Sequence, residues 1–325
     1  MQIIEDKALL LKVRQPEKIT TVIPKSKSVS SHEVVVNWGL EEAQVLKNLN
    51  IKNVPSPIYS KYKWGGRYKP FEHQKETSSF LTLNRRAFVF NEQGTGKTAS
   101  VIWAADYLMK LGRIKKVLVL CPLSIMQSAW QADLFKFAVH RTVGIAHSYS
   151  REKRIDVVNS DVEFVICNYD GLQIIRDAVN ENEFDLIVVD EANAYKTVTT
   201  KRWKILNSII KPHTWVWMLT GTPASQSPTD AYGLAKIINP SGVPKYFGSF
   251  KDMVMYKVSE FIWLPKDKAE DVVHKALQPA IRFTKEECLD LPEMTYTTRQ
   301  VPLTKQQNTF YEKIRKDMLT IAAGE

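Results

Sequence analysis

The sequence has few cysteines and no long apolar stretch. Its cysteines stand at positions 121, 167 and 288 of 325 residues, too few and too scattered for a disulfide framework or a zinc site. No run of about 18 uncharged apolar residues occurs, so neither a membrane-spanning helix nor a membrane partner is predicted. Residues 1–6 lack the basic-then-apolar order of a signal peptide, and the cytoplasm is the expected location.

Negative charge is the scarcer sign. The chain has 45 Lys and Arg residues against 35 Asp and Glu residues, a formal net charge of +10. This excess favours a polyanionic partner, most often a nucleic acid, although a basic surface without any partner would have the same composition. With 44% hydrophobic and 25% charged residues, the chain is expected to form one large domain with an appendage, or two domains.

Residues 1–60 differ in pattern from the rest of the chain. They combine short apolar runs with polar turns and one helical pattern, and predict a small accessory α+β domain. A stretch rich in proline and glycine follows at 54–66 and indicates a domain boundary. The strands are expected near 9–13 and 34–36, and the helix at 41–49.

From about residue 70 the pattern becomes regular, and wholly apolar runs alternate with helical patterns such as that of residues 98–111. Short buried strands that alternate with helices predict a mainly parallel sheet covered on both faces. We therefore expect one α/β lobe over residues 61–300, followed over 301–325 by a linker or the start of a second lobe. Ligands of such sheets bind beyond the carboxyl ends of the strands. The runs that predict strands are 87–90, 117–121, 164–167, 186–189 and 215–219.

Residues 91–98, Asn-Glu-Gln-Gly-Thr-Gly-Lys-Thr, lie between the first strand and the helical pattern, where a phosphate-binding loop is found. The glycines let backbone N–H groups face a phosphate at the positive end of the helix. Lys97 is placed to reach the β and γ phosphates of a nucleotide, and Thr98 to hold Mg²⁺. Asn91 replaces the glycine of the signature, and we expect it to be tolerated because asparagine accepts left-handed backbone conformations. The residues of this loop that we predict to bind the nucleotide are Gly94, Thr95, Gly96, Lys97 and Thr98.

Two further strand ends carry polar motifs. Asp190 and Glu191 follow the run 186–189, and acidic groups at such a strand end are required by a Mg-ATP site. Asp190 would hold the metal, and Glu191 would polarise the attacking water. The turn Thr-Gly-Thr-Pro at 220–223 follows the last run, and its hydroxyls are suited to sensing the γ-phosphate or contacting a nucleic-acid backbone.

This ordered set of motifs resembles the first motor lobe of superfamily 2 helicases, and most closely the Swi/Snf-type double-stranded DNA translocases, phage-encoded members included. The likeness extends over residues 70–325. It implies a RecA-like P-loop NTPase lobe that uses ATP and Mg²⁺ to move along, remodel or unwind double-stranded or branched DNA. A phage-encoded chain would work in the host cytoplasm, and a eukaryotic one in the nucleus.

The resemblance also implies roles for residues outside the phosphate loop. Gln74 corresponds to the glutamine that reads adenine. Ser124, which is followed by Trp130, and Asn168 stand in motifs at the family's DNA track. With Thr222, they are our predicted contacts to DNA phosphates. The basic residues Lys196, Lys201, Arg202 and Lys204 fit either the DNA track or a solvated helix face.

One departure concerns coupling between the ATP site and the turn at 220–223. The family usually has histidine where Asn193 stands, and that residue couples the ATP site to the turn at Thr220. Because asparagine also forms hydrogen bonds, we expect ATP hydrolysis to persist. The replacement of histidine by asparagine is expected to affect the coupling between the ATP site and the turn.

Residues 281–286, 291–292 and 301–307, together with Tyr311, resemble the exit from the first lobe toward a second one. The resemblance implies that hydrolysis needs arginines from a second RecA-like lobe, and the remaining residues are too few to form it. We therefore expect a missing C-terminal lobe and weak or no activity of this chain alone. Two other functions fit the same motifs, an RNA helicase and a nucleotide-gated nucleic-acid-binding module without motor activity.

Overall fold

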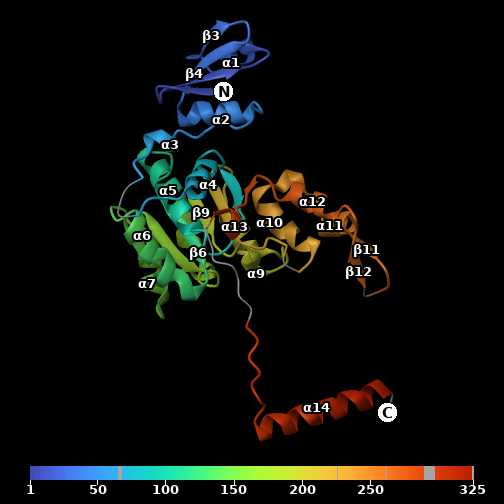
Figure 1. Ribbon diagram of the computed structural model, residues 1–325. Helices are drawn as coiled ribbons and strands as arrows, with labels where there is room; N and C mark the ends of the chain where they lie inside the picture. Colours follow the sequence, from blue (N-terminus) through green and yellow to red (C-terminus); the bar gives the residue numbers. More distant parts are fainter. Residues whose placement is uncertain (65–67, 225, 261, 289–296, 324–325) are drawn as a thin grey trace. The chain divides into compact units, whose positions relative to one another are not determined.

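The computed structural model describes residues 1–64, 68–224, 226–260, 262–288 and 297–323 (Figure 1). The chain divides into two compact units, Met1–Leu289 and Asp290–Glu325. Within the second unit, the described structure is helix α14 (Lys305–Ala323). The predicted exit residues Leu291 and Pro292 lie outside the described residues.

The N-terminal segment forms a small antiparallel sheet with two helices, which confirms its predicted α+β character. The sheet has the order β1-β2-β4-β3. Alternate residues of its central strands, such as Leu9 and Leu11 or Val34 and Val36, are buried, because successive side chains of a strand point to opposite faces. The elements are β1 (Gln2–Ile4), β2 (Ala8–Lys12), α1 (Pro16–Val22), β3 (Lys27–Ser30), β4 (Glu33–Asn37) and α2 (Leu40–Asn48).

The larger part of the first unit contains a seven-stranded sheet with the order β13-β5-β10-β9-β6-β8-β7. All of its pairings are parallel, so the predicted parallel α/β lobe is confirmed. All five predicted strands are present, and two short strands that were not predicted, β7 and β13, form the edges. The strands are β5 (Arg86–Val89), β6 (Val117–Cys121), β7 (Val143–Ile145), β8 (Phe164–Asn168), β9 (Leu186–Val189), β10 (Trp215–Leu219) and β13 (Ala280–Ile281).

Helices cover both faces of this sheet, which explains why its central strands are apolar throughout. Along β6, Val117 and Val119 belong to one apolar cluster, whereas Leu118 and Leu120 belong to the other. One cluster contains residues of α3 (Ile58–Lys61), α4 (Glu72–Thr82), α5 (Lys97–Lys110) and α6 (Ala132–Phe137). The other contains residues of α7 (Arg151–Asn159), α8 (Leu172–Glu181), α9 (Lys201–Ile209), α10 (Ala231–Ile238) and α12 (Ala269–Ala276).

Several smaller elements connect these layers. They include the helical turns η1 (Leu123–Ile125), η3 (Ala192–Tyr195), η4 (Pro228–Asp230) and η5 (Pro240–Gly242), and the π-helical segment η2 (Met126–Gln131). The helices α11 (Phe247–Val254) and α13 (Lys285–Cys288) and the hairpin of β11 (Met255–Lys257) with β12 (Trp263–Pro265) complete the first unit.

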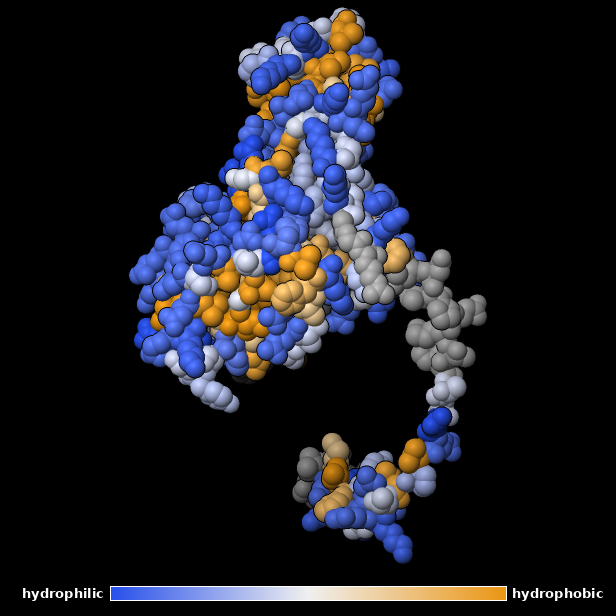
Figure 2. Space-filling model, turned by 90° about the vertical axis from the view of Figure 1, so that its left-hand side faces the viewer, coloured by the Kyte–Doolittle hydropathy of each residue, from blue (hydrophilic) through white to orange (hydrophobic). Residues whose placement is uncertain are grey.

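Aromatic and thiol side chains contribute to the core. Trp215 and Trp217 are buried side chains of β10, and Cys121 and Cys167 are buried thiols. No helix within the described ranges is both long and apolar enough to span a membrane. Polar side chains predominate on the face shown in Figure 2, and apolar ones gather in limited areas of it.

Candidate nucleotide site

The three polar motifs of the sequence meet at one edge of the sheet. Strands β5, β10 and β9 are neighbours and run parallel, so the segments that follow their carboxyl ends lie side by side. The loop 91–96 follows β5, the pair Asp190-Glu191 follows β9, and the turn 220–223 follows β10. The strand order therefore brings together motifs that are about 30 to 130 residues apart in the sequence.

The loop after β5 has the backbone of a phosphate cradle. Gly94 and Gly96 have φ angles of +86° and +80°, a conformation that favours glycine. A Cβ atom on Gly96 would lie only 2.1 Å from Nε2 of Gln74, so a larger residue would also displace the Gln74 side chain. Helix α5 begins at Lys97, which directs its first N–H groups toward the loop.

Lys97 is held by the loop itself. Its Nζ atom donates hydrogen bonds to the main-chain oxygens of Asn91 at 2.8 Å and Glu92 at 3.2 Å. Burial lowers the pKa of Lys97, and the negative charges of Asp190 and Glu191 oppose that shift. The ammonium thus has acidic neighbours and replaceable carbonyl partners, and a phosphate can take the place of the latter.

Asn91 is accommodated in a different way from the one that the sequence suggested. The expected left-handed backbone is wrong, because Asn91 is absent from the described residues with positive φ. Its side chain is buried instead, and its Nδ2 atom donates to Oγ1 of Thr77 on α4 at 2.9 Å. The side chain therefore ties the start of the phosphate loop to helix α4.

Gln74 also contacts the loop from α4. Its Nε2 atom donates to the main-chain oxygen of Thr95 at 3.1 Å, and its Oε1 atom accepts from the N–H of Phe71 at 3.1 Å. Nε2 of His73 lies 2.8 Å from the same Thr95 oxygen. These contacts brace the phosphate loop, and adenine recognition by Gln74 stays a prediction.

Asp190 is a buried carboxylate with two hydrogen-bond donors from the protein. Its Oδ2 atom accepts from Nε1 of Trp130 at 2.9 Å, and its Oδ1 atom from the N–H of Glu191 at 3.0 Å. Burial raises the pKa of Asp190, and the hydrogen bond from Trp130 and the positive charge of Lys97 oppose that shift. Thr98, the second residue of α5, is half-buried.

Asn193 contacts the turn that follows β10. Its Nδ2 atom donates to Oγ1 of Thr220 at 3.2 Å and to the main-chain oxygen of Thr222 at 2.7 Å. Asparagine thus forms, in this chain, a direct connection between the segment after β9 and the turn. Its coupling role stays a prediction.

The predicted DNA contacts are placed along the same sheet edge. Ser124 lies just beyond β6, Asn168 ends β8, and Thr222 lies beyond β10. Ser124 and Thr222 are exposed, and Asn168 is half-buried. Oδ1 of Asn168 is buried and accepts no hydrogen bond from the described residues. All three residues thus lie at the same edge of the sheet. Strand β10, which precedes Thr222, is separated by β9 from β6 and β8, which carry the other two residues.

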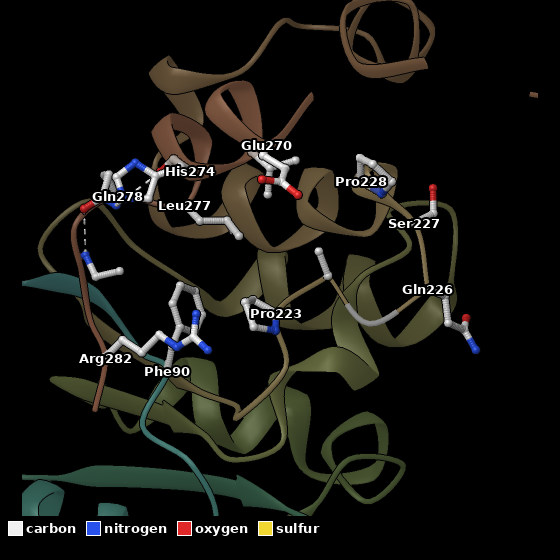
Figure 3. Close-up of a pocket in the computed structure, with 13 residues that line it drawn as sticks. Phe90, Pro223, Gln226, Ser227, Pro228, Glu270, His274, Leu277, Gln278 and Arg282 are labelled. Atoms are coloured by element: carbon white, nitrogen blue, oxygen red, sulfur yellow. Dashed lines mark hydrogen bonds between the residues drawn. The ribbon is translucent and has the colours of Figure 1, made fainter. Parts of the chain in front are cut away.

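The cavity shown in Figure 3 is separate from the phosphate loop. It has a volume of about 490 Å³ and contains none of the predicted site residues. Phe90, Pro223 and Leu277 point into it, with Arg282 at one side (Figure 3). Phe90 directly precedes the phosphate loop in sequence, and Pro223 is the last residue of the turn at 220–223.

Within the ranges that the structure describes, no group of three or more His, Cys, Asp or Glu side chains is arranged to hold a metal ion. This is compatible with Mg²⁺, which is usually held by one or two carboxylates together with substrate phosphates and water.

A comparison with models of protein families shows which family the chain belongs to. The model of the SNF2-related domain matches residues 30–325. The chain belongs to the SNF2-related family. This confirms the resemblance to Swi/Snf-type ATPases that the motifs suggested, and the match begins within the accessory segment.

Individual relatives agree with the family. The "Uncharacterized ATP-dependent helicase YqhH" of Bacillus subtilis is 26% identical over 63% of this chain and 35% of its own length. Protein p41 of Acyrthosiphon pisum secondary endosymbiont phage 1 is 29% identical over 53% of this chain and 39% of its own. The chain therefore spans well under half the length of either relative.

A solved structure shows the same fold. The Sulfolobus solfataricus SWI2/SNF2 ATPase core in complex with double-stranded DNA superposes with a TM-score of 0.58 at 23% identity. The superposition covers 68% of this chain and 46% of that one. Together with the parallel seven-stranded sheet, it confirms the predicted RecA-like lobe.

Two contacts of the site were not predicted from the sequence. Trp130 was noted only as part of a DNA-track motif, yet it donates to Asp190. Tyr169 was only part of the motif around Asn168, yet its hydroxyl donates to the main-chain oxygen of Asp190. Both are aromatic residues that carry a hydrogen-bond donor and stand within or beside a motif, and this feature of the sequence could have pointed to such contacts.

Proposed function

We propose that this chain is the ATP-binding lobe of an ATP-dependent DNA translocase or helicase. The observation that carries the proposal is the meeting of the phosphate loop, the acidic pair and the Asn193-bonded turn on three neighbouring strands. Membership of the SNF2-related family supports it, as do the helicase names of its relatives.

The residues divide the work as follows. Lys97 and the N–H groups of the loop bind the β and γ phosphates, and Gln74 recognises adenine. Thr98 and Asp190 hold Mg²⁺, whose charge would compensate the buried Asp190 carboxylate and the developing phosphate charge. Glu191 accepts the proton of the attacking water, as a general base within reach of the phosphate does.

DNA contacts come from the sheet edge beside the nucleotide site. Ser124, Asn168 and Thr222 would bind phosphates and give little sequence preference, because backbone contacts carry no base information. Asn193 would then transmit the state of the nucleotide to the turn at 220–223 through its bonds to Thr220 and Thr222.

Rapid hydrolysis is proposed to require a second RecA-like lobe. The chain covers about half of the SWI2/SNF2 ATPase cores that it resembles. In related phosphoryl-transfer enzymes, an arginine finger accelerates the reaction by roughly 10³–10⁵. We therefore expect this chain alone to bind Mg-ATP weakly and to hydrolyse it several orders of magnitude more slowly than the full-length protein.

The experiment that tests the function is a steady-state ATPase assay of the full-length protein with different nucleic acids. We expect the greatest stimulation by duplex or forked DNA and less by single strands or RNA. Greater stimulation by RNA would identify an RNA helicase. Tight nucleotide-dependent DNA binding without stimulated hydrolysis would identify a nucleotide-gated binding module.

A further inference from the structure

Tyr169 connects the DNA-track motif to the backbone of the acidic pair. Its hydroxyl donates to the main-chain oxygen of Asp190 and lies 3.4 Å from that of Glu191. Burial raises the pKa of Tyr169, and the negative charge of Asp190 raises it further. The hydroxyl thus contacts the main chain of both residues of the acidic pair.

The backbone that Tyr169 holds is unusual. Glu191 has a φ angle of +48°, in the left-handed region, which residues other than glycine rarely adopt. Such a conformation persists only where the surrounding contacts impose it, and it is found most often at functional sites. The bond of the Glu191 N–H to Asp190 imposes it on one side, and the Tyr169 hydroxyl constrains the carbonyls on the other.

The face of the Tyr169 ring contacts a charged pair near the surface. The guanidinium carbon of Arg202, on α9, lies 5.1 Å from the ring centroid, within the range of a cation–π contact. The same guanidinium pairs with Oδ1 of Asp170 at 2.7 Å. The Asp170 side chain is 79% exposed and that of Arg202 is 32% exposed, so this pair is accessible to a nucleic-acid phosphate.

We propose that Tyr169 is a positioning residue that connects nucleic-acid binding at the Arg202–Asp170 pair to the placement of Glu191. The inference rests on the proposed function and deepens it. A phosphate of the nucleic acid competes with Asp170 for Arg202, and the guanidinium then moves relative to the Tyr169 ring. The hydroxyl passes the movement to the main chain of Asp190 and Glu191, and the carboxylate of Glu191 shifts relative to the attacking water.

A neighbouring tyrosine offers a matched control. Tyr195 packs edge-on against Tyr169 with ring centroids 5.5 Å apart. Its hydroxyl is buried and has no hydrogen-bond partner among the described residues. Tyr195→Phe and Tyr169→Phe thus each remove one hydroxyl from the same aromatic pair, and only the second removes a bond to the acidic pair.

The test compares the two variants with the wild type in the full-length protein, with ATP and duplex DNA each varied. For Tyr169→Phe we expect DNA-stimulated kcat to fall about ten-fold, since a misplaced catalytic group costs up to about 10²-fold in rate. We expect KM for ATP and the DNA concentration for half-maximal stimulation to stay within about two-fold of the wild-type values. The melting temperature should stay within a few degrees of that of the wild type. Tyr195→Phe should behave as wild type in every measurement.

Two results would overturn the inference. One is a Tyr169→Phe variant with wild-type DNA-stimulated kcat. The other is a variant whose ATP binding and melting temperature fall together with its kcat, because that pattern describes a structural role. A wild-type protein without DNA-stimulated hydrolysis would instead refute the proposed function itself, and the wild-type arm alone reveals that case.

Discussion

The Nζ atom of Lys97 lies 2.8 Å from the main-chain oxygen of Asn91. The ammonium therefore donates to a carbonyl of the loop itself, in the place where we propose that it binds a nucleotide phosphate.

Replacing Lys97 with Ala removes this flexible cation and should abolish nucleotide binding. We expect the affinity to fall at least about 100-fold, because a charged hydrogen bond contributes about 1.5–3 kcal/mol and there are two phosphates to bind. A fluorescent ATP analogue measures this. Lys18→Ala, on the exposed surface of α1, serves as the control. Unchanged affinity of the Lys97→Ala variant would remove the lysine from the site.

Glu191→Gln separates binding from hydrolysis. The carboxamide has nearly the shape of the carboxylate but cannot accept the proton of the attacking water, so the variant should bind ATP normally and lose about 10²–10⁴-fold in turnover. Nucleotide affinity and single-turnover hydrolysis are the two measurements. Glu181→Gln, at the exposed end of α8, is the matched control. Normal turnover of the Glu191→Gln variant would contradict its role as general base.

The sequence predicted the sheet well, because buried parallel strands are continuous apolar runs. β9 coincides with the predicted run 186–189, and β5 differs by one residue at each end. The edge strands β7 and β13 have three and two residues, too short to give a recognisable pattern.

The site was predictable where it is contiguous in sequence. The loop 91–98 contains its own glycines, lysine and threonine, and the structure shows the expected turn into α5. The bond from Trp130 to Asp190 joins residues 60 positions apart, and it depends on β6 lying beside β9. The partner of Asn91, Thr77, lies on another helix, so local backbone preference gave the wrong reason for tolerating asparagine.

Nucleic-acid binding should depend steeply on salt if the contacts are made mainly to phosphates. The logarithm of the association constant should fall by about 0.9 per neutralised phosphate for each tenfold rise in salt. Affinity measured for two unrelated duplex sequences between low and physiological salt tests this expectation. Equal slopes and similar affinities for both duplexes are predicted. A flat salt response, or strong preference for one sequence, would argue against translocation along DNA.

A buried carboxylate away from the nucleotide site should control stability at low pH. The Asp106 side chain, on α5, is fully buried and accepts bonds from Tyr62 at 2.6 Å, His140 at 2.8 Å and Arg141 at 2.7 Å, and pairs with Lys110 at 2.8 Å. Burial alone would raise its pKa, but these four partners outweigh burial and lower the pKa from 3.8 to about 2.

Because the pKa of Asp106 is lower in the folded state, its contribution to stability is complete above about pH 4 and is lost as pH falls toward 2. Asp106→Asn removes the negative charge that these partners bond to, and should lower the free energy of unfolding at pH 7 by about 2–3 kcal/mol, the equivalent of the pKa shift. The difference from wild type should shrink as pH falls from 4 to 2. Urea unfolding across this range measures it, with the exposed Asp177→Asn as control. A difference that is the same at pH 7 and pH 2 would show that the ionised carboxylate is not responsible.

The most direct test of the account is whether the full-length protein moves along duplex DNA with ATP. The measurement is displacement of a triplex-forming strand from a duplex, a reaction that requires movement but no unwinding of the duplex. We predict displacement with Mg-ATP, none with a non-hydrolysable analogue, and none by the Glu191→Gln variant in spite of its ATP and DNA binding. ATP hydrolysis stimulated by duplex DNA without any displacement of the third strand would contradict the account.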